Sequence, residues 1–514
     1  MTTRLRSIRM RHRTRAIIMA SLVAAACARQ PAPEPAPTAM PPVVTPPPVT
    51  QTPTPVPPSL DRTVSPKLGS PKPLTLPPVV TRTLPNGLRI LVVEHHELPV
   101  ADFILITATG VEADPPNRSG LATLLTSLLD EGTTSRSALQ IADQEAFLGI
   151  SLSTSSGWDA SRISLHTPTA QLDSALALMA DVTLHPSFPA PELNRLRAER
   201  LTELIQLRDR GPGVADVAYP AIIYGNEHPY GRPMLGTEAS VAAITRADLE
   251  RFYRTYFRPN NSTLIVVGDV TPDDIARRVE AMFGRWERAE VPKTAISAAK
   301  PAGNTAVYLI DKPGAAQSSV RIGGVGVARS TRDYFGLLLA NTILGGSFTS
   351  RLNQNLRETK GYTYGASSRF DMRQSAGPFT ARAEIVAEKT DSALVEFMKE
   401  LRAIRDTVPA AELAKAKTYL QLQMPASFET TGQIASQLVP IVLYDLPLDY
   451  YNSYAQQIDR LTQADIQRVA REYIDPSRLA IVIVGDRASI EGGVRALRLG
   501  EILVRDLSGQ PIRP

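Results

Sequence analysis

The sequence predicts an α+β protein built from two homologous lobes, each a mostly antiparallel sheet with helices packed on one face. The main observation is an internal repeat: residues 244–249 (ITRADL) are echoed by residues 461–466 (LTQADI), and matching residues continue at a constant separation of 217 positions. Each copy is typical of a helix opened by a threonine N-cap, followed by a proline-containing turn and a buried strand ending at Gly-Asp. The 514 residues, 43% of them hydrophobic, are sufficient for two such cores.

The first residues of the chain are typical of an exported protein. Six arginines and no acidic residue lie among the first fifteen positions, and residues 16–26 form an apolar run too short to span a bilayer. We therefore expect residues 1–26 to be a signal peptide. The run ends at Cys27, the only cysteine, after residues 23–26 (VAAA), which resemble the lipobox of bacterial lipoproteins, with alanine where leucine is usual. Two alternatives follow: lipidation of Cys27, which would anchor a periplasmic protein to the outer membrane, or ordinary cleavage that removes Cys27 or leaves an idle thiol.

Residues 27–79 are expected to be a linker. Proline is very frequent there, with threonine and valine between the prolines, which favours an extended and semi-rigid spacer. Once the six arginines of the signal peptide are removed, 50 basic residues remain against 51 acidic ones. A nearly neutral mature chain gives no electrostatic support for nucleic-acid binding, so no nucleic-acid partner is expected.

The two lobes are expected at residues 80–292 and 301–510. Near the front of each lobe, Gly120 and Gly336, each followed by leucine, match at a separation of 216 positions. The helix that begins after Gly120 has leucines at helical spacing, which predicts a one-sided apolar stripe facing the core; they are Leu121, Leu124, Leu125, Leu128 and Leu129.

Several segments together resemble the insulinase or pitrilysin-type zinc metallopeptidases, in the bacterial branch similar to mitochondrial processing peptidase. These segments are residues 84–89 (LPNGLR), 120–122 (GLA), 131–133 (EGT), 185–188 (HPSF) and 259–261 (PNN). Their order and spacing extend the resemblance over roughly residues 80–490. The resemblance implies two lobes that enclose a cavity.

The metal motif of that family is absent in this chain. The resemblance places HxxEH at residues 123–127, where Thr123 and Ser127 replace the two histidines and Thr126 replaces the catalytic glutamate. A distal glutamate completes the site in active relatives, and either Glu203 or Gln206 occupies its position here. Neither choice restores a zinc site, because hydroxyl groups are poor zinc ligands and one carboxylate is insufficient. We therefore expect no metal and no cofactor in this chain.

Two other charged segments have simpler interpretations. His95 and His96 are adjacent on an extended segment and point to opposite sides, so one ion could not easily use both. Glu199 and Glu203 lie one helical turn apart among arginines that include Arg200, a pattern typical of a solvated charged helix face.

The second lobe retains segments that resemble the family's substrate-contacting motifs. Residues 344–352 (LGGSFTSRL) resemble its glycine loop, which assigns Gly345, Gly346 and Ser347 to a substrate loop, although the glycines could merely end a helix. Residues 356–364 (LRETKGYTY) resemble its LRExxGxxY motif. By that resemblance Arg357 and Tyr364 hydrogen-bond the substrate backbone and stabilise developing negative charge. The alternative is that Arg357 pairs on its own helix and Tyr364 packs in a strand.

Two functions remain open from the sequence. The first is a non-catalytic, peptide-binding subunit of an insulinase-like zinc metallopeptidase. In that case Arg357 and Tyr364 would act on a peptide or unfolded polypeptide, and zinc would be held only by a partner chain with intact HxxEH. The second is a scaffold or peptide-binding protein of the same fold without any proteolytic role.

Overall fold

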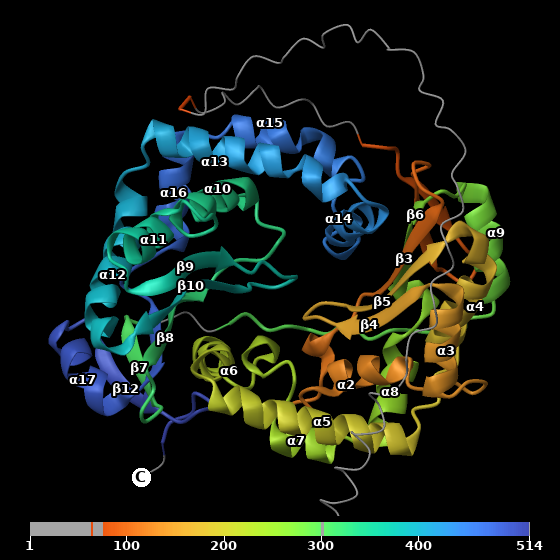
Figure 1. The fold of residues 1–514 in the computed structure, drawn as a ribbon, viewed down its shortest axis with the longest axis horizontal. Helices are drawn as coiled ribbons and strands as arrows, with labels where there is room; N and C mark the ends of the chain where they lie inside the picture. The colour runs from red at the N-terminus through yellow and green to blue at the C-terminus, as the bar shows by residue number, and fades with distance from the viewer. Residues whose placement is uncertain (1–62, 65–75, 300–302, 513–514) are drawn as a thin grey trace, which may run out of the picture. The chain divides into compact units, whose positions relative to one another are not determined.

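The computed structural model describes residues 63–64, 76–299 and 303–512, and both predicted lobes lie in one compact unit, Ser70–Pro514. The signal peptide and Cys27 fall outside the described residues, as does nearly all of the proline-rich linker, so these assignments stay predictions. Two six-stranded sheets form the framework (Figure 1), which confirms the predicted α+β class with two lobes. The enclosed cavity between the lobes and the exact domain boundaries stay predictions.

The first sheet is mostly antiparallel; only the pair β2–β6 is parallel. In spatial order its strands are β1 (Val80–Thr83), β2 (Arg89–Glu94), β6 (Ser262–Gly268), β3 (Val100–Thr107), β5 (Ser161–Pro168) and β4 (Ser151–Ser156). The α-helices of this half of the chain are α2 (Leu121–Leu129), α3 (Ala138–Leu148), α4 (Leu172–Leu184), α5 (Ala190–Asp209), α6 (Gly211–Tyr224), α7 (Glu238–Ala243), α8 (Arg246–Tyr256) and α9 (Pro272–Phe283).

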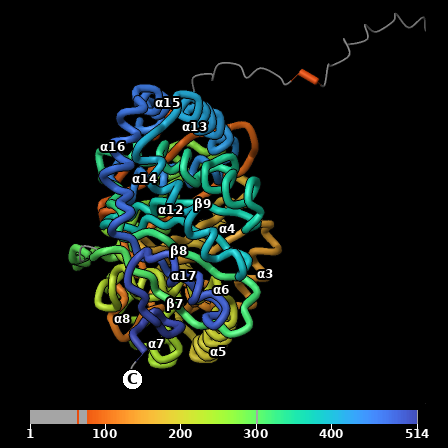
Figure 2. The backbone as a smooth tube through the Cα atoms, turned by 90° about the vertical axis from the view of Figure 1, so that its left-hand side faces the viewer, coloured from red at the N-terminus to blue at the C-terminus, as the bar shows by residue number. Residues whose placement is uncertain are grey.

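The second sheet repeats this plan, with β12 and β11 both parallel to β7 and the remaining pairs antiparallel. In spatial order its strands are β12 (Glu501–Arg505), β7 (Ala306–Asp311), β11 (Ala480–Gly485), β8 (Gln317–Val325), β10 (Pro378–Val386) and β9 (Thr363–Phe370). The α-helices of this half of the chain are α10 (Tyr334–Leu344), α11 (Arg351–Asn353), α12 (Thr390–Asp406), α13 (Ala410–Gln423), α14 (Thr431–Leu443), α15 (Tyr454–Asp459), α16 (Gln463–Tyr473) and α17 (Arg487–Ala496). In Figure 2, α12, α16 and α17 lie in front of this sheet, and α12 contacts both α16 and α17.

The repeat that predicted the fold is reproduced in detail. Helices α8 and α16 begin and end 217 positions apart. Thr245 and Thr462 cap them, and each accepts a hydrogen bond from the backbone of Asp248 or Asp465, whose carboxylate in turn accepts from the threonine backbone. This reciprocal capping satisfies two otherwise unpaired N–H groups at each helix start. The predicted threonine N-caps are therefore confirmed.

The two lobes exchange one helix each. Helix α14, from the second half of the chain, packs on β3 and β6 of the first sheet (Figure 1), with Ile434 and Leu438 in one apolar cluster with Ile104 and Ile265. Helix α6, from the first half, packs on β8 and β11 of the second sheet. Each lobe's own helices cover one face of its sheet, as predicted, while the opposite face is covered by a helix of the other lobe.

A polar and aromatic junction also joins the lobes. The buried Asp159 accepts hydrogen bonds from the Tyr230 hydroxyl at 2.7 Å and from the Gln374 backbone N–H at 2.9 Å. The Arg373 guanidinium lies 4.0 Å from the ring centroid of Trp158 and 4.6 Å from that of Tyr230. Because Asp159, Tyr230 and Arg373 are buried and the contacts join both halves of the chain, separation of the lobes would leave polar groups without partners.

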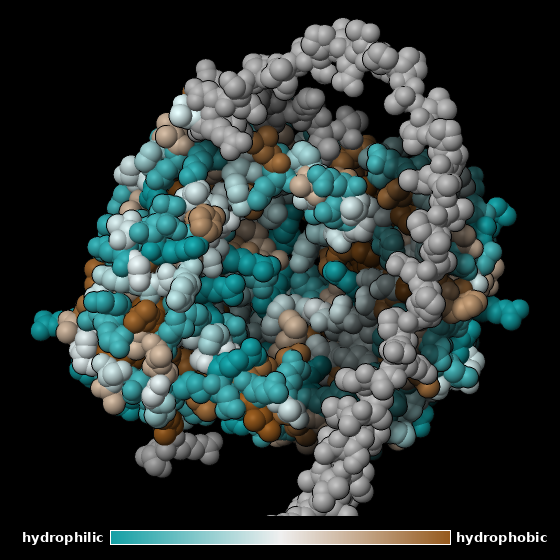
Figure 3. Space-filling model, in the orientation of Figure 1, coloured by the Kyte–Doolittle hydropathy of each residue, from teal (hydrophilic) through white to brown (hydrophobic). Residues whose placement is uncertain are grey.

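The visible surface is mixed in character. Figure 3 shows hydrophilic residues over most of this face, with smaller apolar patches between them. None of the helices in the described part of the chain is long and apolar enough to cross a bilayer.

Candidate functional site

The three residues at the HxxEH position lie on α2, and their hydroxyl groups are directed at backbone carbonyl oxygens. Thr123 donates to Gly120 at 3.1 Å and Ser127 donates to Thr123 at 3.0 Å. Thr126 reaches two carbonyl oxygens of the preceding turn, each at 3.1 Å. Such local bonds are the ordinary arrangement of serine and threonine inside a helix. They leave no convergent set of ligands comparable to two imidazoles and a carboxylate.

The predicted leucine stripe of α2 faces the core, but the rest of the helix is buried on nearly all sides as well. Every residue from Leu121 to Leu129 except Ser127 is buried, including Thr123 and Thr126. The helix contacts β4 and β5 of its own sheet and also α5 and α8. Leucine spacing showed which face meets the sheet, but small hydroxyl residues on the other face allow close approach of further elements.

Arg200, on α5, occupies the polar side of this position. Its Nη1 donates to Thr123 Oγ1 at 3.0 Å, and its Nε lies 3.1 Å from Glu203 Oε2. The side chain is only 11% exposed. Burial lowers the pKa of Arg200, and the neighbouring Glu203 opposes that shift. A cationic group thus contacts the hydroxyl that stands at the first ligand position.

The residues around Arg200 do not fit a zinc ion. Among residues 63–64, 76–299 and 303–512, no group of three or more His, Cys, Asp or Glu side chains could hold a metal. Glu203 is half exposed and paired with Arg200, whereas Gln206 is exposed and has no polar side-chain contact in the described part. Arg200 would repel a divalent cation at Thr123.

The charged-face interpretation of α5 was therefore wrong at one position. Arg195 does lie near the surface, where it pairs with Glu131, Glu192 and Glu199. Arg200, one and a half turns further along, is buried against α2. Sequence spacing alone does not distinguish an arginine that points at a neighbouring helix from one that points to solvent.

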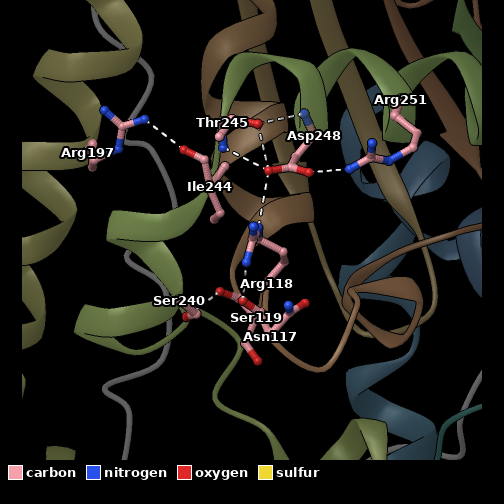
Figure 4. A network of polar contacts seen from close by, with 9 residues as sticks. All are labelled: Asn117, Arg118, Ser119, Arg197, Ser240, Ile244, Thr245, Asp248 and Arg251. Atoms are coloured by element: carbon pink, nitrogen blue, oxygen red, sulfur yellow. Dashed lines mark hydrogen bonds and ion pairs between the residues drawn. The ribbon is translucent and has the colours of Figure 1, made fainter.

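A second polar network fixes the loop that leads into α2 (Figure 4). Arg118 Nε donates to Asp248 Oδ2 at 3.1 Å, and Ser240 Oγ donates to the Ser119 carbonyl at 2.8 Å. Asp248 also pairs with Arg251 and caps α8 through Thr245. Although burial opposes it, hydrogen bonds from Thr245 and Arg118 lower the pKa of Asp248 to about 2.

We expect Asp248→Asn to destabilise the protein by about 2 kcal/mol at pH 7. The folded-state pKa is depressed, so this contribution is present above about pH 4, the ordinary range for aspartate, and is lost as the pH falls toward about 2. Asp465→Asn is the matched control, because Asp465 caps α16 in the same way but is only partly buried and has no ion pair with an arginine; its cost should be below about 1 kcal/mol. Urea denaturation at several pH values measures both, and equal losses for the two variants would contradict the role of the arginines.

In the second lobe, Arg357 and Tyr364 are both accessible. Arg357 lies in a short π-helical segment, Gln354–Thr359, and its side chain is 38% exposed. Its Nε is 3.3 Å from Glu358 Oε1, and its guanidinium lies 4.7 Å from the ring centroid of Phe348, which is also exposed. Tyr364 is 90% exposed on β9, at the end of the sheet. Its hydroxyl and ring have no hydrogen bond or ring contact among the described residues, so Tyr364 does not pack in its strand.

The glycine loop has a packing explanation within the protein. Gly345 and Gly346 end α10, and both backbone N–H groups bond to the Asn341 carbonyl. A Cβ atom at Gly345 would lie 2.2 Å from the backbone nitrogen of Ser368 on β9, so only glycine fits there. Ser347 Oγ donates to the Thr342 carbonyl at 3.2 Å. The assignment of Gly345, Gly346 and Ser347 to substrate stays a prediction.

Comparison with known proteins identifies the relatives of this chain. Residues 89–238 match the family described as insulinase (peptidase family M16), and residues 243–420 match the description peptidase M16 inactive domain. An uncharacterized zinc protease of Mycobacterium leprae is 27% identical over 424 residues, covering 81% of this chain and 94% of the relative. One of Bacillus subtilis is 25% identical, covering 75% and 93%.

Solved structures agree with these matches. A peptidase M16 inactive domain from Pseudomonas fluorescens has a TM-score of 0.75 and 27% identity, covering 79% of this chain and 98% of that one. The first half of the periplasmic protease PqqL from Escherichia coli is similar in fold alone, with a TM-score of 0.66 and 17% identity, covering 82% and 98%. Together the two family matches cover more than half of the sequence in chain order. The chain therefore belongs to the insulinase family of peptidases, family M16, and lacks that family's HxxEH motif.

Proposed function

We propose that this chain is a non-catalytic, peptide-binding subunit of an insulinase-like zinc metallopeptidase. The observation that carries the proposal is the contrast between its two lobes. The position of the metal motif holds three hydroxyl side chains and a buried arginine, Arg200, whereas Arg357 and Tyr364 are exposed. One lobe is unsuited to a metal, while the other keeps donors free for a ligand.

The chemistry of Arg357 and Tyr364 supports contact with a peptide backbone. A guanidinium remains charged throughout the physiological range, and a neutral phenol donates one hydrogen bond. Both are suited to a carbonyl oxygen that gains negative charge. The weak neighbour of Arg357 is Glu358, next in sequence and exposed, so a ligand could replace that contact at small cost.

An edge strand in each sheet supports binding of an extended chain. Strands β4 and β9 are each the last strand of their sheet and pair on one side only. Such edges can accept a peptide as an additional strand through backbone hydrogen bonds. On β4 one outward N–H, that of Leu152, is already bonded to Glu145. Serines and threonines make up the rest of this strand, so specificity for side chains there would be low.

The catalytic metal would belong to a partner. In the proposal, a second chain of the same family with intact HxxEH holds zinc, and the present chain contributes Arg357 and Tyr364. A signal peptide and lipidated Cys27 would place this assembly in the periplasm at the outer membrane, with the proline-rich segment as spacer.

The test combines the chain with an HxxEH-bearing relative encoded beside it. The mixture should cleave peptides in a chelator-sensitive way, and Arg357→Ala should lower kcat about a hundredfold, because a charged donor to the transition state is lost. Tyr364→Phe should lower kcat less, since it removes a neutral donor. Arg460→Ala, an exposed arginine of the same lobe, is the control and should leave kcat unchanged.

Association and turnover must be measured separately. Arg357→Ala should co-purify with the partner as well as the unaltered chain does. If the complex forms but cleaves no peptide, the scaffold function is favoured instead. Cleavage by Arg357→Ala as fast as by the unaltered chain would refute the role proposed for Arg357.

A further inference from the structure

A cavity of about 430 Å³ is lined by residues of the second half of the chain, and Arg357 and Tyr364 are not among them. It is bounded by α10, the end of β9, the end of α13, and α14 with the segment that follows it. Its walls are rich in aromatic side chains: Tyr334, Phe428, Tyr444, Tyr450, Tyr451 and Tyr454. Its volume is in the range of small-molecule binding sites, which combine apolar walls with a few polar groups.

Two arginines line this cavity, and one of them, Arg329, is only 8% exposed. Its Nη2 donates to the Tyr450 hydroxyl at 2.9 Å, and its guanidinium carbon lies 3.5 Å from the ring centroid of Tyr334. No carboxylate among the described residues lies within 4.0 Å of it. The lining carboxylate, Asp371, is already paired with Arg373 at 2.6 Å and Arg369 at 3.3 Å.

Other buried arginines of this lobe, unlike Arg329, are paired with carboxylates. Arg321 pairs with Asp216 and Glu384, and Arg373 pairs with Asp371. A buried guanidinium has five N–H donors, of which Arg329 uses one with a protein acceptor. Stacking on tyrosine compensates part of the desolvation of this charge, but less than a carboxylate would. Arg329 is therefore a donor-rich cation that faces the cavity and has no carboxylate partner among the described residues.

The tyrosines around Arg329 remain protonated and add further donors. Burial raises the pKa of Tyr444 and of Tyr451 to about 12, and also raises the pKa values of Tyr450 and Tyr454. The Tyr450 hydroxyl accepts from Arg329, so its own proton is available to a ligand. The cavity thus offers a charged donor, a phenol donor and aromatic faces.

We propose that this cavity binds a carboxylate carried on an apolar or aromatic group. Arg329 pairs with the carboxylate, Tyr450 donates to it, and the surrounding rings pack against the apolar body. The C-terminal carboxylate of a peptide that ends in a bulky apolar residue has this chemistry, and so does a small aromatic acid. The site is distinct from the proposed contacts at Arg357 and Tyr364, and its existence does not depend on them.

Calorimetric titration of the full chain tests the proposal with three probes: N-acetyl-Leu-Phe with a free carboxylate, the same dipeptide as its C-terminal amide, and 3-phenylpropanoate. We expect the free acid to bind at least about tenfold more tightly than the amide, since the amide lacks the charge that Arg329 would pair with. Binding of 3-phenylpropanoate as well would identify a small acid as sufficient, and binding of the dipeptide acid alone would identify a peptide C-terminus.

Variants assign the binding to Arg329. Arg329→Gln should lose the preference for acid over amide, whereas Arg369→Gln, at an exposed arginine of the same cavity, should retain it. If Arg329→Gln does not fold, two other measurements test the proposal. They are the binding of the dipeptide acid to Tyr450→Phe and the comparison of acid with amide on the unaltered chain. Equal binding of acid and amide, no binding of any probe, or loss of preference only in Arg369→Gln would overturn the proposal.

Discussion

Restoring the three motif residues should not restore zinc binding while Arg200 remains. We expect the combination Thr123→His, Thr126→Glu and Ser127→His to bind zinc at least about a hundredfold more weakly than the same combination with Arg200→Ala. The guanidinium contacts position 123 at 3.0 Å and also holds Glu203, the carboxylate available as a third ligand. Removal of Arg200 takes away a positive charge and frees that carboxylate.

Zinc content and affinity, measured by metal analysis and competition with a chelating dye, give the readout. The unaltered chain should carry no stoichiometric zinc. Because Thr123 and Thr126 are buried, the larger side chains should also cost about 1–3 kcal/mol through overpacking, so folding must be checked by circular dichroism. Arg208→Ala, an exposed arginine on the same helix, is the control that should leave zinc affinity unchanged. Tight zinc binding with Arg200 in place would refute its blocking role.

Loss of the exchanged helix contacts should destabilise both lobes together. Tyr219, on α6, is 3% exposed, packs with Val482 and Val484 of the second sheet, and donates its hydroxyl to the Phe379 carbonyl. We expect Tyr219→Ala to cost about 3–5 kcal/mol, because it creates a cavity and leaves that carbonyl unpaired. Tyr219→Phe should cost only about 1–2 kcal/mol, since the ring remains.

The chain provides a control with the same chemical change. Tyr364→Ala removes a tyrosine that is 90% exposed and should alter the unfolding free energy by less than about 0.5 kcal/mol. Urea denaturation, followed by fluorescence and circular dichroism, should show one shifted transition for Tyr219→Ala. Two separate transitions, with one lobe unaffected, would mean that α6 does not couple the lobes.

The repeat made the fold predictable, but only in part. Residues 244–249 and 461–466 located α8 and α16 and their threonine caps, because capping is a local interaction that sequence spacing encodes. The exchange of α6 and α14 is not local. The strand β6 is buried along its whole length, as its apolar run at residues 264–267 predicts, but helices were expected on one face of the sheet only. That run does not say which helix covers the second face.

The site was predictable to a similar degree. The resemblance located Thr123, Thr126 and Ser127 and the second-lobe pair Arg357 and Tyr364. It could not reveal Arg200, because the contact with Thr123 joins helices 77 positions apart. The sequence could not reveal Arg329 either. Its unusual property is that no carboxylate pairs with it in space, and no pattern along the chain encodes that.

The helix exchange has a consequence for what each half of the sequence contains. A chain divided between α9 and β7 would leave the first sheet without α14 and the second without α6. Each piece would then present a bare apolar face together with one surplus helix shaped for the other piece. Although the halves share one plan and each forms its own main core, they complement one another, because each supplies the helix that covers the second face of the other's sheet.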